Sequence, residues 1–145
     1  MKPKTTWIVI ADSQRAFVLK RDKPKGELTV VQSANWKAEA AAEIADKQGR
    51  SFATKGASRS AMEPHINSQP KESIFAKVVA TDLATAQQAG RFDQLVLCAG
   101  PKMLSELADA AEPLLGRYLR GQLQKNLVNA PITEIKRHLD DLMLH

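Results

Sequence analysis

Trp7–Ala11 (WIVIA) is apolar at every position, and this short run constrains the fold more than any other stretch of the chain. The polar group Asp12–Arg15 follows it, and a second apolar run, Ala16–Leu19, comes next. Both runs favour strands, and the break between them has the length of a hairpin turn. A strand without polar alternation is covered on both faces, so we expect Trp7–Ala11 to be a central strand.

Further apolar patterns predict the other elements of this sheet. They favour three further strands, at Glu27–Gln32, Gln94–Ala99 and Gly121–Val128. They also favour three helices, at Glu72–Ala89, at Lys102–Ala111 and from Ile132 onward, so that strands and helices alternate along this part of the chain. The first three strands form an antiparallel meander, and the later βαβ unit needs a right-handed crossover. The expected fold is α/β and ribonuclease-H-like, with three layers. Its five-stranded mixed sheet has the order 3-2-1-4-5, with helices on both faces.

The middle of the chain lacks such patterns. Trp36–Asp46 is alanine-rich and is compatible with either a short helix or a loose connector. Residues 47–71 show no periodicity, and their glycines and prolines lie among serines and basic residues. Long unpatterned stretches inside a compact domain are usually functional or disordered. We therefore expect a single domain, residues 1–145, with a mobile basic loop at about 47–71.

This basic loop holds most of the candidate binding residues. The chain has a net charge of +5, and the segment 49–59 places three basic residues among serines and glycines, with Phe52 nearby. Such a composition suits contact with RNA phosphates and stacking of Phe52 on a base. In the alternative, the loop is simply a solvated basic segment that Phe52 anchors to the core. The candidate ligand-binding or RNA-binding residues are Arg15, Arg50, Ser51, Phe52, Lys55 and Arg59.

Asp12 ends the predicted central strand and is the weak candidate for a catalytic acid. A two-metal hydrolase of the ribonuclease-H type needs several carboxylates that converge on the metal ions. Asp93 precedes its strand and should lie at the opposite edge of the sheet, and the predicted fifth strand contains no acid. We therefore expect Asp12 to form an Asx-turn or a salt bridge with Arg15. We expect no catalytic residue, metal site or cofactor.

Cys98 is the one cysteine, and it lies within the apolar run Gln94–Ala99. A small buried side chain is the simplest role for a cysteine in such a run. A single cysteine also fits a reducing compartment, and no apolar run approaches the roughly 20 residues that span a bilayer. We therefore expect a cytoplasmic protein without membrane insertion.

Four short motifs follow one another along the chain. They are TWIVIAD at 6–12, RA at 15–16, GRSF at 49–52 and FDQLVL at 92–97, before a Gly-Pro turn. In order and spacing they resemble the host attachment protein family, also called proteins required for attachment to host cells. The resemblance implies a ribonuclease-H-like fold, because the family is distantly similar to the middle domain of archaeal and eukaryotic peptide release factors. The chain departs from the family at Asn126-Leu127, where members commonly carry Asp-Leu.

The resemblance implies two functions of different classes. Similarity to release factors implies a non-catalytic module that binds RNA or the ribosome, here through the basic loop. The family name implies a factor that supports bacterial attachment to host cells, directly or indirectly. Metal-dependent hydrolysis through Asp12 is the third and least supported hypothesis, and the oligomeric state is open.

If the basic loop binds RNA, replacing Arg50 and Arg59 by Ala should flatten the dependence of RNA affinity on salt. Each cation that contacts a phosphate releases counterions, so fewer contacts give a smaller slope of log affinity against log salt concentration. Filter binding of RNA to the wild type and to Arg50→Ala/Arg59→Ala at several salt concentrations measures this slope. An unchanged slope would remove both arginines from the binding surface.

Overall fold

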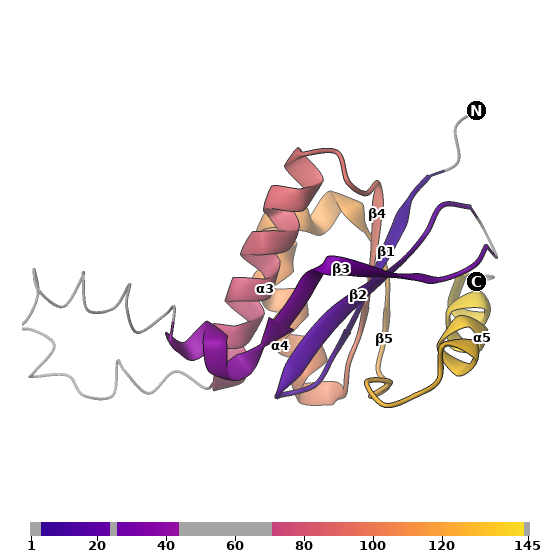
Figure 1. Ribbon diagram of the computed structural model, residues 1–145. Coiled ribbons are helices and arrows are strands. Elements are labelled where there is room, and N and C mark those ends of the chain that lie inside the picture. Colours follow the sequence, from indigo (N-terminus) through magenta and orange to yellow (C-terminus); the bar gives the residue numbers. More distant parts are fainter. Residues whose placement is uncertain (1–3, 24–25, 44–70, 144–145) are drawn as a thin grey trace, which may run out of the picture.

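The computed structural model describes residues 4–23, 26–43 and 71–143, which form a mixed sheet between two layers of helices (Figure 1). The sheet has five strands in the order β3-β2-β1-β4-β5. The elements are β1 (Thr6–Ala11), β2 (Arg15–Arg21), β3 (Thr29–Lys37), α3 (Lys71–Gln88), β4 (Gln94–Cys98), α4 (Pro101–Leu115), the 3-10 helix η2 (Gly116–Tyr118), β5 (Leu119–Leu123) and α5 (Ile132–Met143). This architecture confirms the predicted α/β fold and strand order.

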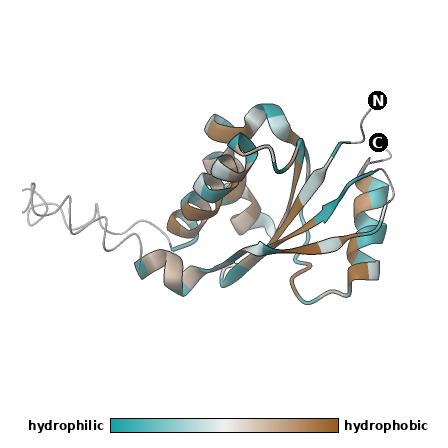
Figure 2. Ribbon diagram, turned by 45° about the horizontal axis from the view of Figure 1, so that its top comes forward, coloured by the Kyte–Doolittle hydropathy of each residue, from teal (hydrophilic) through white to brown (hydrophobic). Residues whose placement is uncertain are grey.

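The central strand β1 packs on both of its faces, as its uninterrupted apolar sequence predicted. It pairs antiparallel with β2 on one side and parallel with β4 on the other. Trp7 and Val9 belong to the core under α3 and α4, whereas Ile8 and Ile10 belong to the core under α5. All four side chains are at most 2% exposed. Hydrophobic residues accordingly follow the strands through the middle of the molecule (Figure 2).

Helices α3 and α4 together cover one face of the sheet, and α5 covers the other (Figure 1). The sequence predicted that the second of these helices ends near Ala111, but α4 continues through Pro113 to Leu115. Proline inside a helix removes one backbone hydrogen bond, which usually ends the helix. Here Leu115 is almost fully buried, and its burial offsets that loss. None of the helices in the described part combines the length and apolar composition that a membrane span requires.

Strand β3 is longer than predicted and starts later. It runs Thr29–Lys37 instead of Glu27–Gln32, and residues 38–43 that follow it are helical. Trp36, predicted to begin a helix or connector, instead pairs with Ala16 of β2. Its indole Nε1 donates a hydrogen bond of 2.7 Å to Asp82 of α3. This tertiary contact, which the local sequence does not reveal, extends the strand.

Strand β5 lies earlier in the chain than the predicted Gly121–Val128. It pairs parallel with β4, with Leu119 opposite Leu95, and ends at Leu123. Leu127 is buried against α5 from the segment after the strand, so its apolar character reflects packing and not strand alternation. Gly121 permits a close approach of α5, because a Cβ there would lie 3.2 Å from Leu142 Cδ2.

An ion pair between Arg21 and Asp140 joins β2 to α5. Arg21 Nη1 lies 2.6 Å from Asp140 Oδ1, and the two side chains are 2% and 22% exposed. Lys136 lies 3.3 Å from the other carboxylate oxygen. Partial burial raises the pKa of Asp140, but the hydrogen bonds and charges of Arg21 and Lys136 outweigh it, so the pKa lies below its ordinary value of 3.8. The pair therefore stabilises the fold above this value, and the stabilisation is lost as the pH falls through the lowered pKa.

Replacing Asp140 by Ala should lower the free energy of unfolding by about 3 kcal/mol, because Arg21 would remain buried without its counter-charge. This is the low end for a buried pair, since Asp140 is partly exposed. The double change Arg21→Met/Asp140→Leu should cost less than Asp140→Ala alone, because it leaves no buried charge. Urea unfolding at neutral pH measures both effects, and the gap between wild type and Asp140→Ala should shrink in acid. Equal losses in the single and double variants would contradict this account.

Candidate functional site

Asp12 is a turn residue of the hairpin between β1 and β2. Its Oδ1 atom accepts hydrogen bonds from the backbone N–H groups of Gln14, at 2.8 Å, and Arg15, at 2.9 Å. Its own N–H donates to the carbonyl of Arg15 at 2.9 Å. This is the Asx-turn that the sequence favoured as one of two alternatives. One of the two carboxylate oxygens of Asp12 is therefore engaged in fixing the turn.

The other acid considered for catalysis lies at the opposite edge of the sheet. Asp93 Oδ2 accepts a hydrogen bond of 3.0 Å from the backbone N–H of Thr5, just before β1 begins. Asp12 follows the end of the same strand, so the length of β1 separates the two carboxylates. Within residues 4–23, 26–43 and 71–143, no three His, Cys, Asp or Glu residues gather where they could hold a metal ion.

Of the predicted binding residues, only Arg15 lies in the described part of the chain. Arg15 donates from Nη2 to Asn129 Oδ1 at 2.8 Å and so ties the hairpin turn to the segment before α5. Asn129 lines a hollow of about 530 Å³ that also contains the carboxylate of Glu134 and the imidazole of His138. The remaining candidates fall outside the described residues and stay predictions: Arg50, Ser51, Phe52, Lys55 and Arg59.

A different set of residues surrounds Trp7, which pairs with Lys20 near the C-terminal end of β2. The turn that ends α3 places Arg91 over the ring of Trp7. Gly90 has a φ of 76°, which glycine adopts readily. The N–H of Gly90 donates to Gln87 O at 2.8 Å and the N–H of Arg91 to Ala86 O at 3.1 Å. These bonds form a Schellman motif, which fixes the direction in which the chain leaves the helix.

The ring of Trp7 is a rigid support for this arginine. Trp7 is 2% exposed, and its ring centre lies 4.8 Å from that of Phe92. The guanidinium carbon of Arg91 lies 5.2 Å from the ring centre of Trp7, within the range of a cation–π interaction. The packed ring therefore gives the charged end of this exposed side chain a rigid, favourable surface.

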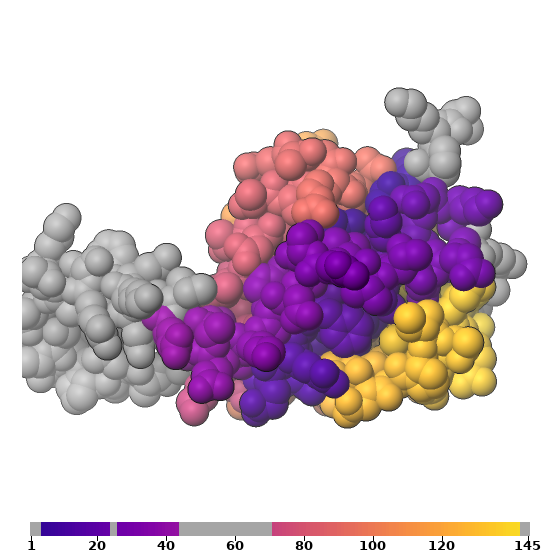
Figure 3. Space-filling view, in the orientation of Figure 1, coloured from indigo at the N-terminus to yellow at the C-terminus, as the bar shows by residue number. Residues whose placement is uncertain are grey.

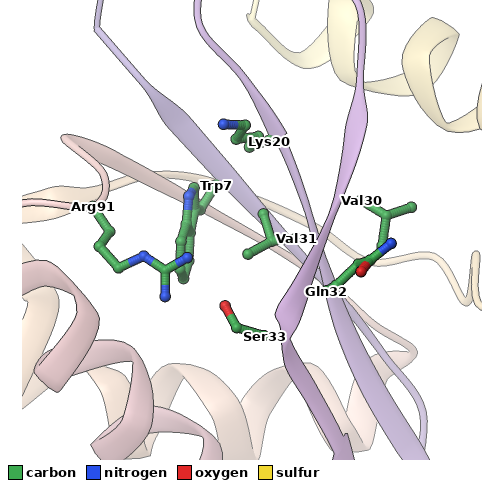
Figure 4. A pocket seen from close by; sticks show the side chains of 7 residues that line it. All are labelled: Trp7, Lys20, Val30, Val31, Gln32, Ser33 and Arg91. Carbon is green, nitrogen blue, oxygen red and sulfur yellow. The ribbon is translucent and has the colours of Figure 1, made fainter.

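A hollow of about 410 Å³ opens beside this pair and contains a second cation (Figure 4). Lys20 lies directly opposite Trp7 on the neighbouring antiparallel strand, so the two side chains share a face of the sheet. Figure 4 shows Lys20, Arg91 and Ser33 around the same space, although they come from β2, the turn after α3 and β3. The hollow is lined by Trp7, Lys20, Val30, Val31, Gln32, Ser33 and Arg91.

The hollow is positively charged. Among the described residues no carboxylate lines it, and neither Lys20 nor Arg91 forms an ion pair. Two neighbouring cations raise the local concentration of anions, and a guanidinium presents donors in a geometry that suits phosphate and carboxylate. The site is therefore suited to an anionic group.

An irregularity in β3 shapes one wall of the hollow. Phe17 pairs with Asn35, but Leu19 pairs with Val30, so β3 contains more residues than β2 between these pairs. The extra residues leave the regular ladder, and Ser33 is among them. Bulges redirect side chains and often lie next to functional sites.

A second hollow, of about 330 Å³, continues along the seam between β3 and α3. The two elements lie side by side on one face of the molecule (Figure 3). This hollow shares Trp7, Ser33 and Arg91 with the first and adds the indole of Trp36 and the carboxylate of Asp82. We refer to the two hollows together as the Trp7 groove. It is cationic at the Lys20 end and has an aromatic ring and an acceptor at the Trp36 end.

The sequence did not predict the Trp7 groove. Trp7 and Arg91 are far apart in the chain, and Lys20 resembles any lysine at the end of a strand. One local signal of the groove was present in the sequence. Gly90 fits the position that follows the end of a helix, and Arg91 comes directly after it. Only the pairing of β1 with β2 and β4 brings the three residues together.

Cys98 lies on the other side of the sheet and is buried. Burial raises the pKa of its thiol to about 12. Because the thiolate is the nucleophile, Cys98 is unreactive at neutral pH and acts as a small core residue, as its sequence context predicted.

Residues 7–139 match the family described as "protein required for attachment to host cells". The chain belongs to this family. The host attachment match runs from β1 into α5, so it contains both the Asp12 turn and the Trp7 groove. No curated protein matches the chain.

Replacing Asp12 by Ala should lower the free energy of unfolding by about 1 kcal/mol, because two backbone N–H groups of the hairpin turn would lose their acceptor. Asn keeps the acceptor oxygen, so Asp12→Asn should unfold close to the wild type. Denaturant unfolding of both variants measures the difference. If Asp12→Asn loses as much free energy of unfolding as Asp12→Ala, the negative charge of Asp12 stabilises the fold and the hydrogen bonds of the turn do not.

Proposed function

We propose that this member of the host attachment family is an RNA-binding module whose Trp7 groove contacts phosphate. The observation that carries the proposal is the placement of Lys20 and Arg91 around one open hollow that no described carboxylate lines. Phosphate oxygens are the anionic groups that lysine and arginine contact most often in nucleic-acid complexes. The net charge of +5 favours association with such a polyanion.

The proposal assigns binding without chemistry. Asp12 fixes a turn, Asp93 lies at the opposite sheet edge, and the Cys98 thiol has a raised pKa of about 12. RNA, alone or within the ribosome, is the proposed partner, and the cytoplasm is the compartment in which both occur. The predicted basic loop, with Arg50, Lys55 and Arg59, would add phosphate contacts to those of the groove.

A second candidate function rests on the family match. Members of the family are described as required for attachment to host cells, so we also consider a factor that supports bacterial attachment, directly or indirectly. The two functions are compatible if RNA binding controls attachment from inside the cell.

The double change Lys20→Ala/Arg91→Ala should weaken RNA binding and reduce the slope of log affinity against log salt by about 1.4, or roughly 0.7 for each lost phosphate contact. Arg117→Ala/Arg120→Ala is the matched control. It removes the same charge at η2 and β5, and Arg117 also lies over an aromatic ring, that of Tyr118 at 5.9 Å. Fluorescence anisotropy with a labelled oligoribonucleotide at several salt concentrations measures both slopes.

Equal losses in the two double variants would mean that only the overall charge matters, and this would contradict the proposal. Measuring attachment of cells that carry the groove variant connects the two candidate functions. Attachment that falls together with RNA binding supports an indirect role, whereas unchanged attachment separates the two functions.

A further inference from the structure

We infer that the Trp7 groove binds one phosphorylated nucleoside, with its terminal phosphate between Lys20 and Arg91 and its base beside Trp36. The inference rests on the proposed RNA binding, but it names a more specific ligand: a phosphate monoester on a nucleoside. Charge, shape and the distribution of donors and acceptors along the groove support it in turn.

The charge at one end favours a monoester over an internal phosphodiester. A phosphate monoester carries about −1.5 to −2 near neutral pH, whereas each phosphate within an RNA strand carries a single charge. Lys20 and Arg91 bring two positive charges to one hollow without a described carboxylate. The guanidinium can bind two phosphate oxygens side by side, and the ammonium binds as a point charge. Ser33 adds a hydroxyl donor on the side of β3.

The other end suits a nucleoside. Trp36 is half-buried, and its ring lines the second hollow. Aromatic rings of this kind stack with bases of any sequence. Asp82 lies beside it, and its Oδ2 atom already accepts the Trp36 indole N–H at 2.7 Å. Its second oxygen is an acceptor for an amino group of a base or a hydroxyl of a sugar.

The two ends are adjacent. Both hollows are lined by Trp7, Ser33 and Arg91, so a ligand that contacts these three residues lies next to both the cationic end and the aromatic end. Their volumes of about 410 and 330 Å³ each lie in the range of roughly 300–1,000 Å³ that is usual for small-molecule sites. A phosphate at one end and a base at the other also gives the ligand a fixed direction.

This ligand chemistry has two sources, a free mononucleotide and the phosphorylated end of an RNA strand. Isothermal titration calorimetry with the full chain separates them. The probes are adenosine 5′-monophosphate, adenosine, and a short oligoribonucleotide of one sequence with a 5′-phosphate, a 3′-phosphate or neither. The proteins are the wild type, Lys20→Ala/Arg91→Ala, the control Arg117→Ala/Arg120→Ala, and Trp36→Leu.

The wild type should bind a phosphorylated probe at least roughly tenfold more tightly than its unphosphorylated partner, because two charge-assisted contacts are lost without the phosphate. The groove variant should abolish this preference and the control should keep it. Trp36→Leu should weaken binding of adenosine 5′-monophosphate but leave the preference for an end phosphate. If adenosine 5′-monophosphate binds, the natural ligand is a free mononucleotide. If the phosphorylated oligoribonucleotide binds and adenosine 5′-monophosphate does not, the natural ligand is the phosphorylated end of an RNA strand.

The remaining outcomes overturn one proposal or the other. RNA binding that ignores end phosphates, with no mononucleotide binding, overturns this inference and leaves the RNA-binding function standing. Mononucleotide binding without RNA binding overturns the RNA-binding function and leaves the inference. Failure of every probe to bind overturns both.

Discussion

The burial of β1 on both faces is the constraint on which the rest of the structure depends. Its backbone hydrogen bonds are satisfied by β2 on one side and β4 on the other, and its side chains alternate between two separate cores. A strand of this kind is stable only when both faces are covered. The layers formed by α3 and α4 and by α5 are therefore both required by one short apolar segment.

The same strand supports the candidate site. Trp7 belongs to the core under α3 and α4, and it is also the surface on which Arg91 rests. Because the ring is fixed by packing against Phe92, it gives the exposed guanidinium of Arg91 a rigid surface to lie on. Preorganised charges of this kind lose less entropy when they bind a ligand. The stability of the fold and the geometry of the groove are thus linked through one residue.

Two adjacent cations of β2 show how the sheet divides structural from binding roles. Lys20 and Arg21 point to opposite faces because side chains alternate along a strand. Arg21 is buried under α5 and pairs with Asp140, which lies on a helix of the same layer. Lys20 faces the α3 side, where it lines the groove and forms no ion pair with a described residue. Arg21 is already paired with a carboxylate and Lys20 is not, so Lys20 is the one that can bind an anionic ligand.

The sequence by itself determined the α/β class, the strand order and the central position of β1, because hydrophobic periodicity and burial follow directly from the residues. It also identified Asp12 as a turn residue, since an Asx-turn is a local interaction. It did not give the ends of β3, α4 and β5, where Trp36, Leu115 and Leu127 respond to partners that are distant in the chain. Only the tertiary structure decided the Trp7 groove, because β-pairing and the turn after α3 bring Trp7, Lys20 and Arg91 together from separate segments.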